Sequence, residues 1–464
     1  MNSGKTDLYR EQQGKNLPSG RKGVKFVYPG VFSERPGVVQ PLVLYRGGKA
    51  MKRRALIIGL VLVLASILHP DLSFSKPIKI LAQFPMSGPV GTLPEFGWGF
   101  IDGMSYINGQ GGVNGKPITY FLEDMRYSPT VEVANFTRIV AAEKRDEFLM
   151  ASGYITGGLK PLIEKVNKEE KIPWLDGSYS TEVFGPGGGP SKYPYYYSLG
   201  ATYGDQMRVL LNWIKEDSQG KGRVGIVYSP TEWGRDPLEV TRAYAQKIGI
   251  KLVGEEEYAY TATDATSQVT NLRKARADYV IYHGYSSAPT HTAIFMKTAR
   301  QYLKKATLLG THYTTGPYLN LTCGKAADGV VGVSCRPQGD DLTNPMVKMS
   351  HEFAEKYKRK DGIKDMFLYM EGLTYALIFH EALSRADKAG QLTREGVKKA
   401  LDDMIWDYHG VFGGRSFAYK SHTIPMVRTY RCKVEKEIEK AGKKIAVGSW
   451  PAISPWINTE IELK

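Results

Sequence analysis

The sequence predicts an α/β protein of two lobes, each built around a doubly wound parallel sheet. Short apolar runs alternate with amphipathic stretches along residues 78–176, and the same alternation starts again at residue 223. Repeated strand, helix, strand units form parallel sheets with crossover helices. Two such series in one chain therefore predict two sheets and two lobes.

The first series supplies four expected strands, at residues 78–84, 118–124, 147–152 and 172–176. A helix is expected over 129–143, where Val133, Phe136 and Val140 recur at spacings of three and four and so lie on one helical face. The following segment, 185–198, is rich in Gly, Pro and Tyr and continues neither pattern. We expect the first crossing between the lobes there.

The second series predicts strands at 223–229, 251–258, 278–284 and 307–311, between helices near 204–216, 236–249, 266–276 and 288–303. After residue 336 the pattern turns helical, over 344–361, 367–386 and 393–404, and a last strand is expected at 427–434. Residues 441–464 are expected to form a surface tail. We assign residues 76–199 and 337–425 to lobe 1, and residues 200–336 and 426–464 to lobe 2.

Residues 51–75 have the pattern of a secretory signal peptide. Lys52, Arg53 and Arg54 precede an apolar run, 55–68, and polar residues follow it. The run is shorter than the roughly 18 to 20 residues that a membrane-spanning helix needs, so we expect no span in the mature chain. We expect cleavage near Lys76, no lipid anchor, and export to the periplasm.

The upstream residues 1–50 show no helical or strand period, and we expect them to have no fold. Two explanations remain open: a misassigned start, or a disordered basic extension. The whole chain carries a net charge of +15, of which residues 76–464 hold +7. Because no basic stripe interleaved with aromatic residues accompanies this charge, nucleic acid is not an expected partner.

The three cysteines exclude a disulfide-built scaffold. Cys323 and Cys335 are close enough in sequence to pair in an oxidising compartment, and we expect a bridge between them; two buried thiols remain the alternative. Cys432 would stay unpaired.

Enzyme motifs are absent from the sequence. There is no dinucleotide fingerprint, phosphate loop, nucleophile elbow or zinc-ligand spacing among the eight histidines. We therefore expect no catalytic residue, no metal and no cofactor. A secreted hydrolase is the less favoured alternative.

Aromatic residues point instead to recognition of a small molecule. They lie at or just beyond the carboxyl ends of expected strands, or at the start of the next helix, where ligands bind in open α/β sheets. This set is Tyr154, Trp174, Tyr179, Tyr203, Trp233, Tyr285 and Tyr313. Thr156, Ser178, Ser180 and Thr181 add hydroxyls beside them, which suit an anionic or carbonyl group.

The run 105–124, SYINGQGGVNGKPITYFLED, resembles a signature of the periplasmic substrate-binding proteins of ABC transporters of the branched-chain amino-acid type. Further similar blocks follow in order, including WGRD at 233–236, TDATSQV at 263–269, LLGTHY at 308–313 and AADGVVGV at 326–333. The similarity covers nearly all of residues 76–436.

The resemblance implies the type I binding-protein fold, in which three crossings join two lobes that close over a ligand. It implies that Thr156, Ser178 and Ser180 hold a ligand carboxylate, with Trp233 and Tyr285 on the opposing lobe. His312 stands where amino-acid binders of the family have a glutamate for the ligand's ammonium. Because that carboxylate is lost, a standard α-amino acid is an unexpected ligand.

The resulting functional expectation is a monomeric periplasmic receptor that delivers a small polar or aromatic solute to an ABC permease. The solute classes kept open are amino acids, amides, urea-like compounds and carboxylic acids. A ligand-sensing subunit of a signalling system remains the alternative.

Overall fold

The computed structural model describes residues 77–88, 94–141, 147–185, 188–286, 288–440 and 443–463. They belong to one compact unit, Ser73–Lys464. The predicted signal peptide, its cleavage point and the upstream extension lie outside the described residues. In the described part of the chain, no helix is long and apolar enough to cross a membrane.

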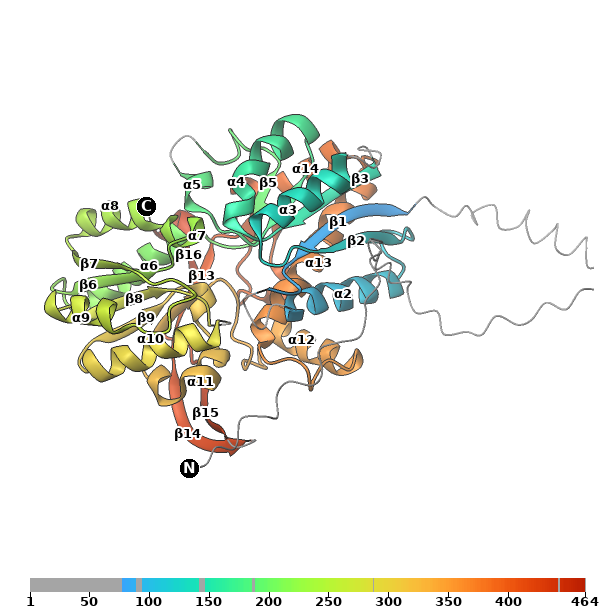
Figure 1. Cartoon of the computed structure of the whole chain (residues 1–464). Coiled ribbons are helices and arrows are strands. Elements are labelled where there is room, and N and C mark those ends of the chain that lie inside the picture. The colour runs from blue at the N-terminus through green and yellow to red at the C-terminus, as the bar shows by residue number, and fades with distance from the viewer. Residues whose placement is uncertain are drawn as a thin grey trace, which may run out of the picture. The chain divides into compact units, whose positions relative to one another are not determined.

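Lobe 1 is built on a five-stranded sheet of order β2-β1-β3-β4-β5, in which every neighbouring pair is parallel. Its strands are β1 (Ile78–Phe84), β2 (Ile118–Asp124), β3 (Phe148–Gly153), β4 (Trp174–Asp176) and β5 (Tyr196–Ser198). Helices α2 (Pro94–Gly109), α3 (Pro129–Phe136), α4 (Thr156–Glu164), α12 (Pro345–Lys356), α13 (Met366–Lys388) and α14 (Arg394–Asp402) surround it (Figure 1). The chain adds β2 on one side of β1 and β3, β4 and β5 on the other side. This change of direction at β1 defines the doubly wound sheet that the sequence predicts.

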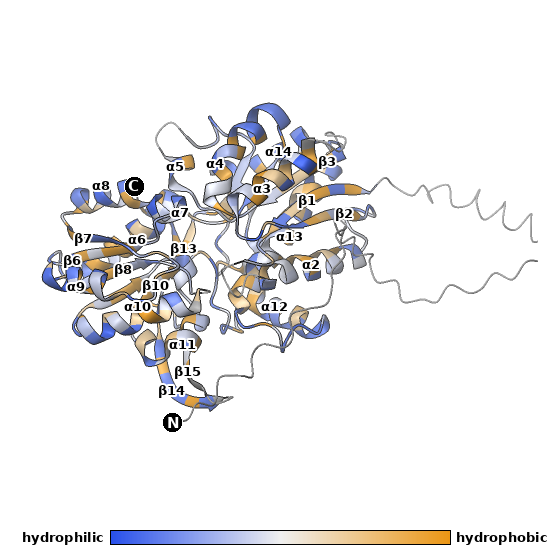
Figure 2. Cartoon of the chain, viewed as in Figure 1, coloured by the Kyte–Doolittle hydropathy of each residue, from blue (hydrophilic) through white to orange (hydrophobic). Residues whose placement is uncertain are grey.

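Lobe 2 is built on a seven-stranded sheet of order β16-β13-β10-β9-β8-β6-β7. Strands β6 (Arg223–Tyr228), β7 (Lys251–Glu257), β8 (Tyr279–His283), β9 (Thr307–Gly310) and β10 (Val331–Ser334) are parallel, and β13 (Met426–Arg431) and β16 (Ile457–Asn458) are antiparallel additions. Its helices include α6 (Tyr203–Asp217), α8 (Leu238–Ile248), α9 (Thr266–Lys274), α10 (Pro289–Tyr302) and α11 (Pro317–Cys323). Figure 2 shows the apolar strands inside and the polar outer faces of α8 and α9.

Three segments connect the two sheets: the chain after β5, the chain after β10 and the chain before β13. Hydrogen bonds hold them together. The amide of Ser198 donates to the carbonyl of His422 at 2.8 Å, and Arg336 Nη2 donates to the carbonyl of Leu199 at 2.5 Å. The predicted three-crossing architecture of two lobes is therefore confirmed. The residue boundaries assigned to the lobes stay a prediction.

Two expectations about the strands need correction. The segment 185–198, expected to be a crossing, ends in β5, and the crossing follows it. Residues 441–464 are not a loose surface tail: β15 (Lys443–Ser449) pairs with β14 (Lys433–Lys440) in a hairpin (Figure 1). Beyond this hairpin Trp450 and Trp456 are buried, each within one of the apolar clusters of the core.

The predicted bridge between Cys323 and Cys335 is wrong in this structure, in which both thiols are free and buried. Cys323 shares an apolar cluster with Cys432, whose backbone pairs with Val330 before the start of β10. Cys335 lies just past the other end of that strand and belongs to a different cluster. An extended strand rises about 3.3 Å per residue, so β10 separates the two cysteines by more than the roughly 7 Å that a disulfide tolerates.

Candidate functional site

The carboxyl ends of strands from both sheets meet at one cavity between the lobes. Its free space is about 10 Å³, room for about one water molecule. It is lined by Tyr127, Tyr154, Ile155, Thr156, Tyr203, Trp233, Tyr285 and Tyr313. Six of the ten residues predicted from sequence to bind a ligand are therefore brought together: Tyr154, Thr156, Tyr203, Trp233, Tyr285 and Tyr313.

Sequence reasoning missed Tyr127 and Ile155. Tyr127 follows β2 as Tyr154 follows β3, so the rule that selected the other aromatic residues applied to it as well. Ile155 gives no such signal, because an aliphatic residue between Tyr154 and Thr156 is ordinary for a strand end.

Aromatic rings make the walls of the cavity flat. The rings of Tyr285 and Tyr313 are stacked, with centroids 4.8 Å apart and planes 9° apart, and Tyr313 is stacked on Tyr179 at 5.7 Å. Trp233 meets Tyr285 edge to face at 5.8 Å, and Tyr127 reaches Tyr285 from the other lobe at 6.3 Å. Rings packed in this way lose little mobility and present stacking surfaces to a flat molecule.

The lining residues carry no charge. Burial raises the pKa of Tyr127 to about 12 and raises those of Tyr154, Tyr203 and Tyr313 well above the ordinary tyrosine value. The phenols therefore keep their protons at physiological pH and act as neutral donors and acceptors.

Thr156 opens helix α4, whose N-cap residue Ile155 provides no side-chain cap. The hydroxyl of Thr156 is 2.8 Å from that of Ser178. The amides at the start of a helix carry partial positive charge and often bind anions. This end of α4 lies at the cavity wall, because Ile155 and Thr156 both line it.

Two buried carboxyls hold the loops that carry Thr156 and Ser178. Glu132 Oε1 accepts from the amide of Tyr154 at 2.8 Å, and Asp176 Oδ1 accepts from the amide of Ser178 at 2.8 Å. Burial raises the pKa of Asp176 to about 7; burial and the nearby Asp176 raise that of Glu132 well above its usual range. Neither carboxyl lines the cavity.

Four predicted ligand-binding residues, Ser178, Tyr179, Ser180 and His312, lie outside the cavity lining. The Ser178 hydroxyl pairs with Thr156, as described above. Ser180 donates to Asp236 Oδ1 at 2.5 Å, and the Tyr179 phenol donates to Glu371 at 3.2 Å. Their polar groups are thus engaged by the protein itself. A ligand-binding role for any of the ten residues stays a prediction.

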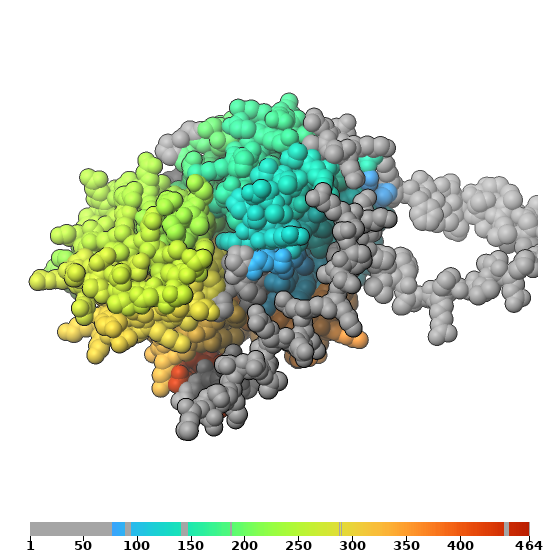
Figure 3. Space-filling model, in the orientation of Figure 1, coloured from blue at the N-terminus to red at the C-terminus, as the bar shows by residue number. Residues whose placement is uncertain are grey.

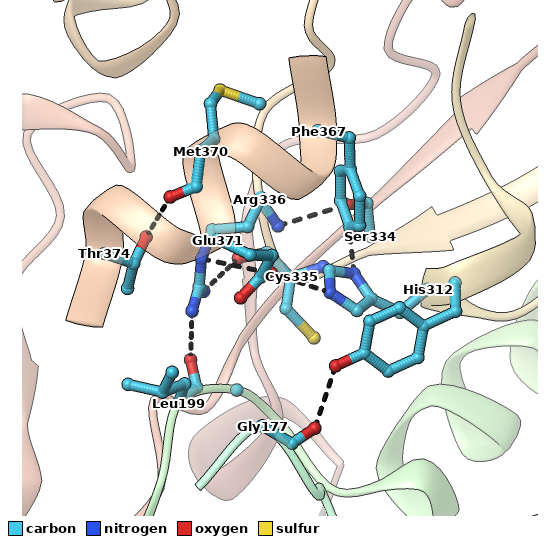
Figure 4. Close-up of polar contacts among 12 residues, drawn as sticks. Gly177, Leu199, His312, Ser334, Cys335, Arg336, Phe367, Met370, Glu371 and Thr374 are labelled. Carbon is cyan, nitrogen blue, oxygen red and sulfur yellow. Dashed lines mark hydrogen bonds and ion pairs between the residues drawn. The ribbon is translucent and has the colours of Figure 1, made fainter. Parts of the chain in front are cut away.

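His312 belongs to a fully buried cluster with Glu371 and Arg336 (Figure 4). The amide of Cys335 donates to His312 Nδ1 at 3.0 Å, so Nδ1 is the unprotonated nitrogen. Nε2 therefore carries the hydrogen and donates it to Glu371 Oε1 at 3.0 Å. Both ring nitrogens have protein partners. Burial lowers the pKa of His312 although Glu371 opposes the shift, so the ring is neutral.

Glu371 comes from α13 and is the charged centre of this cluster. Burial alone would raise its pKa, but Arg336, with Nε 3.5 Å from Oε1, and the His312 hydrogen bond outweigh burial and lower it. Arg336 also donates to the carbonyls of Cys335 at 2.8 Å and Leu199 (Figure 4). The carboxylate is thus ionised and already neutralised. Glu371 and Arg336 were not predicted to meet, because they lie far apart in the chain.

The lobes are closed around the cavity. The Tyr313 phenol donates to the carbonyl of Gly177 across the lobes at 2.8 Å, and Lys160 Nζ lies 2.5 Å from Glu232 Oε2 at the rim. In the space-filling view, the green and yellow atoms of lobe 2 abut the teal atoms of lobe 1 (Figure 3). The cavity is therefore enclosed by residues of both lobes.

A larger hollow lies away from this cavity, between residues 341–345 and the C-terminal residues around Trp456. Its two arginines already have partners: Arg428 Nε donates to the carbonyl of Ser454 at 2.9 Å, and Arg415 Nη2 donates to Glu462 at 2.9 Å. Because it does not lie where the carboxyl ends of both parallel sheets meet, size alone does not favour it as the functional site.

Two α/β lobes, three crossings and a cavity closed from both sides define a two-lobed solute-binding protein. Residues 77–437 match the periplasmic binding protein family, and the chain belongs to that family. This is a family of transporter binding components, not of enzymes.

Similar proteins agree on the architecture. The Leu/Ile/Val-binding protein of Citrobacter freundii is 22% identical over 79% of this chain and 95% of its own length. A branched-chain amino-acid ABC transporter protein from Thermus thermophilus, solved with bound valine, has a TM-score of 0.67 and 23% identity, over 81% of this chain and 96% of that one. A solute-binding protein from Rhodopseudomonas palustris, solved with 3,4-dihydroxybenzoic acid, has a TM-score of 0.61 and 17% identity, over 82% and 98%.

Proposed function

We propose that the protein is an extracytoplasmic receptor that captures a small polar or aromatic solute between its lobes and delivers it to an ABC permease. The single observation that carries the proposal is the enclosed cavity, which both lobes line with buried aromatic residues. A solute that contacts both lobes favours the closed state over the open one, so binding and closure are coupled.

The signal-peptide pattern of residues 51–75 supports the periplasm as the compartment. Proteins of this fold are solved with ligands as different as valine and 3,4-dihydroxybenzoic acid, so the fold alone does not select the solute. The proposed receptor function therefore leaves four classes of solute open: amino acids, amides, urea-like compounds and carboxylic acids.

A transport role is tested by reconstituting the protein with its permease in vesicles. We expect solute uptake and ATP hydrolysis to require the receptor, and small-angle scattering to report compaction when the solute binds. A receptor that binds solute but copurifies with a sensor kinase, and leaves the permease unstimulated, would favour the signalling alternative. Catalytic consumption of the solute would refute both.

A further inference from the structure

We infer that the solute is a small, flat carboxylate that carries no ammonium group. This inference rests on the proposed receptor function and specifies its ligand. It follows from three properties of the cavity: donors without partners, the absence of a free counter-charge for a cation, and flat walls.

Three polar groups of the cavity wall lack hydrogen-bond partners. Among the described residues, Trp233 Nε1 and the hydroxyls of Tyr285 and Tyr154 are buried and unpaired, and these side chains are at most 5% exposed. An indole N–H only donates, and burying it without an acceptor costs free energy. An occupant of the cavity must therefore present acceptor atoms to lobe 2.

The opposite wall also favours an acceptor. Helix α4 has nine residues, and its first turn with the Thr156 hydroxyl lies at the cavity. The partial positive charge of a helix N-terminus stabilises a carboxylate. Together with the unpaired donors of lobe 2, it makes the cavity rich in donors on both sides.

None of the described residues that line the cavity is a carboxylate, and Glu132, whose Oε2 has no partner, does not line it. The lining residues are neutral, and Glu371, which contacts the neighbouring Tyr179, is already paired with Arg336 and hydrogen-bonded by His312. Asp236 accepts from the Ser180 hydroxyl and the Thr181 amide. A desolvated ammonium without a counter-charge is costly to bury. The cavity therefore discriminates against amines and α-amino acids.

The size and shape of the cavity limit the body of the solute. The closed cavity has only about 10 Å³ of free space, far below the roughly 300 to 1,000 Å³ of drug-sized pockets, so the lobes must move apart around any solute and a small solute requires the least movement. Tyr285 and Trp233 border the cavity with aromatic rings, which suit a planar group, whereas both faces of Tyr313 are already covered by Tyr285 and Tyr179. A single aromatic ring or a short unsaturated chain attached to a carboxylate is small and planar, and therefore suits these aromatic walls best.

Matched ligands test this assignment by calorimetric titration of the full mature protein. Phenylacetate and phenylglycine differ only in the α-ammonium group, and phenylacetamide replaces the carboxylate by a neutral amide. We expect phenylacetate to bind at least about tenfold more tightly than phenylglycine, since an unpaired buried charge is penalised. A second pair, 4-methylpentanoate and leucine, makes the same comparison between two ligands with an aliphatic side chain.

Two variants test the donors. Trp233→Phe and Tyr285→Phe keep a ring and remove the unpaired N–H or O–H, so each should weaken phenylacetate binding about tenfold. Trp213→Phe, in α6, and Tyr302→Phe, at the end of α10, make the same exchanges away from the cavity and should leave binding unchanged. Equal losses in the cavity variants and the controls would contradict the assignment.

Equal or tighter binding of phenylglycine or leucine overturns the inference, and so does tighter binding of phenylacetamide or the absence of any carboxylate binding. The receptor function has a separate readout. If an amide, a urea-like compound or an amino acid compacts the protein and stimulates the permease, the receptor proposal holds while the carboxylate class fails.

Discussion

At the scale of single residues, the ion pair of Arg336 and Glu371 is fully buried and therefore sensitive to the loss of either partner. Both side chains are fully buried, and they join the second crossing to helix α13. Glu371→Gln removes the negative charge and leaves the guanidinium unneutralised. Breaking one side of a buried pair typically costs about 3–5 kcal/mol. We expect urea unfolding to show a loss of this order.

The matched control for this experiment is Glu381→Gln on the same helix. Glu381 pairs with Arg385 one helical turn away, and both side chains are partly exposed. A surface pair of this kind contributes about 0–1 kcal/mol. Equal losses of stability in the two variants would show that the buried pair contributes no more to the free energy of unfolding than the surface pair does.

The cysteines allow a second prediction at this scale. All three are free and buried, and burial raises the pKa of Cys335 to about 12, which suppresses its reactive thiolate. The native protein should resist a maleimide reagent, and the unfolded protein should take up three equivalents without prior reduction. Mass spectrometry that found only one labelled thiol after unfolding would show that two are bridged.

At the scale of elements, helices α2 and α13 pack closely enough to need glycine at their contact. A Cβ atom at Gly372 would collide with the backbone carbonyl of Phe96. Gly to Ala in a helix normally stabilises by about 1 kcal/mol, but overpacking of this kind typically costs about 1–3 kcal/mol. Gly372→Ala should therefore lower the melting temperature.

Gly109, at the end of α2, provides the comparison, because no atom lies within 4 Å of the position that its Cβ would take. Gly109→Ala should leave the melting temperature unchanged or raise it. A fall at Gly109 equal to the fall at Gly372 would show that helix propensity or turn geometry, not the close contact, controls both positions.

At the scale of the whole molecule, buried carboxyls should make stability fall on the alkaline side. Burial raises the pKa of Glu95 to about 8 and that of Asp176 to about 7. A carboxyl that folding shifts upward stabilises fully below its unfolded pKa, and this contribution is lost as pH rises through the folded value. The stabilisation by these carboxyls is therefore lost between about pH 4 and about pH 8.

Buried histidines act in the opposite direction at lower pH. Burial lowers the pKa values of His283 and His291 to about 4, so they destabilise the fold as pH falls below their unfolded value of about 6.5. Above that pH the raised carboxyls dominate the slope, and the buried cysteines add to it in the same direction near pH 8.5. We expect the free energy of unfolding to drop by roughly 1–3 kcal/mol between about pH 6.5 and 8.5. Asp176→Asn should flatten this slope, whatever its effect on absolute stability, and an unchanged slope would contradict the assignment.

Much of the architecture follows from the sequence alone. Strands β1 and β2 match their predicted ranges because each is a continuous apolar or alternating run with a turn on either side. Strand β5 was missed because it ends a segment rich in Gly, Pro and Tyr, and β10 was missed although β9, which is equally short, was predicted. The hairpin of β14 and β15 was missed because its Lys and Glu residues resemble a solvated tail.

The sequence also located the cavity, because ligands bind where parallel strands end and aromatic residues cluster there. Only the tertiary structure decided which polar groups remain available. His312 is neutral and fully engaged because Glu371 and Arg336 reach it from α13 and the second crossing. Local patterns depend on neighbours in the chain, whereas the partners of a buried polar group come from distant segments brought together only when the lobes fold.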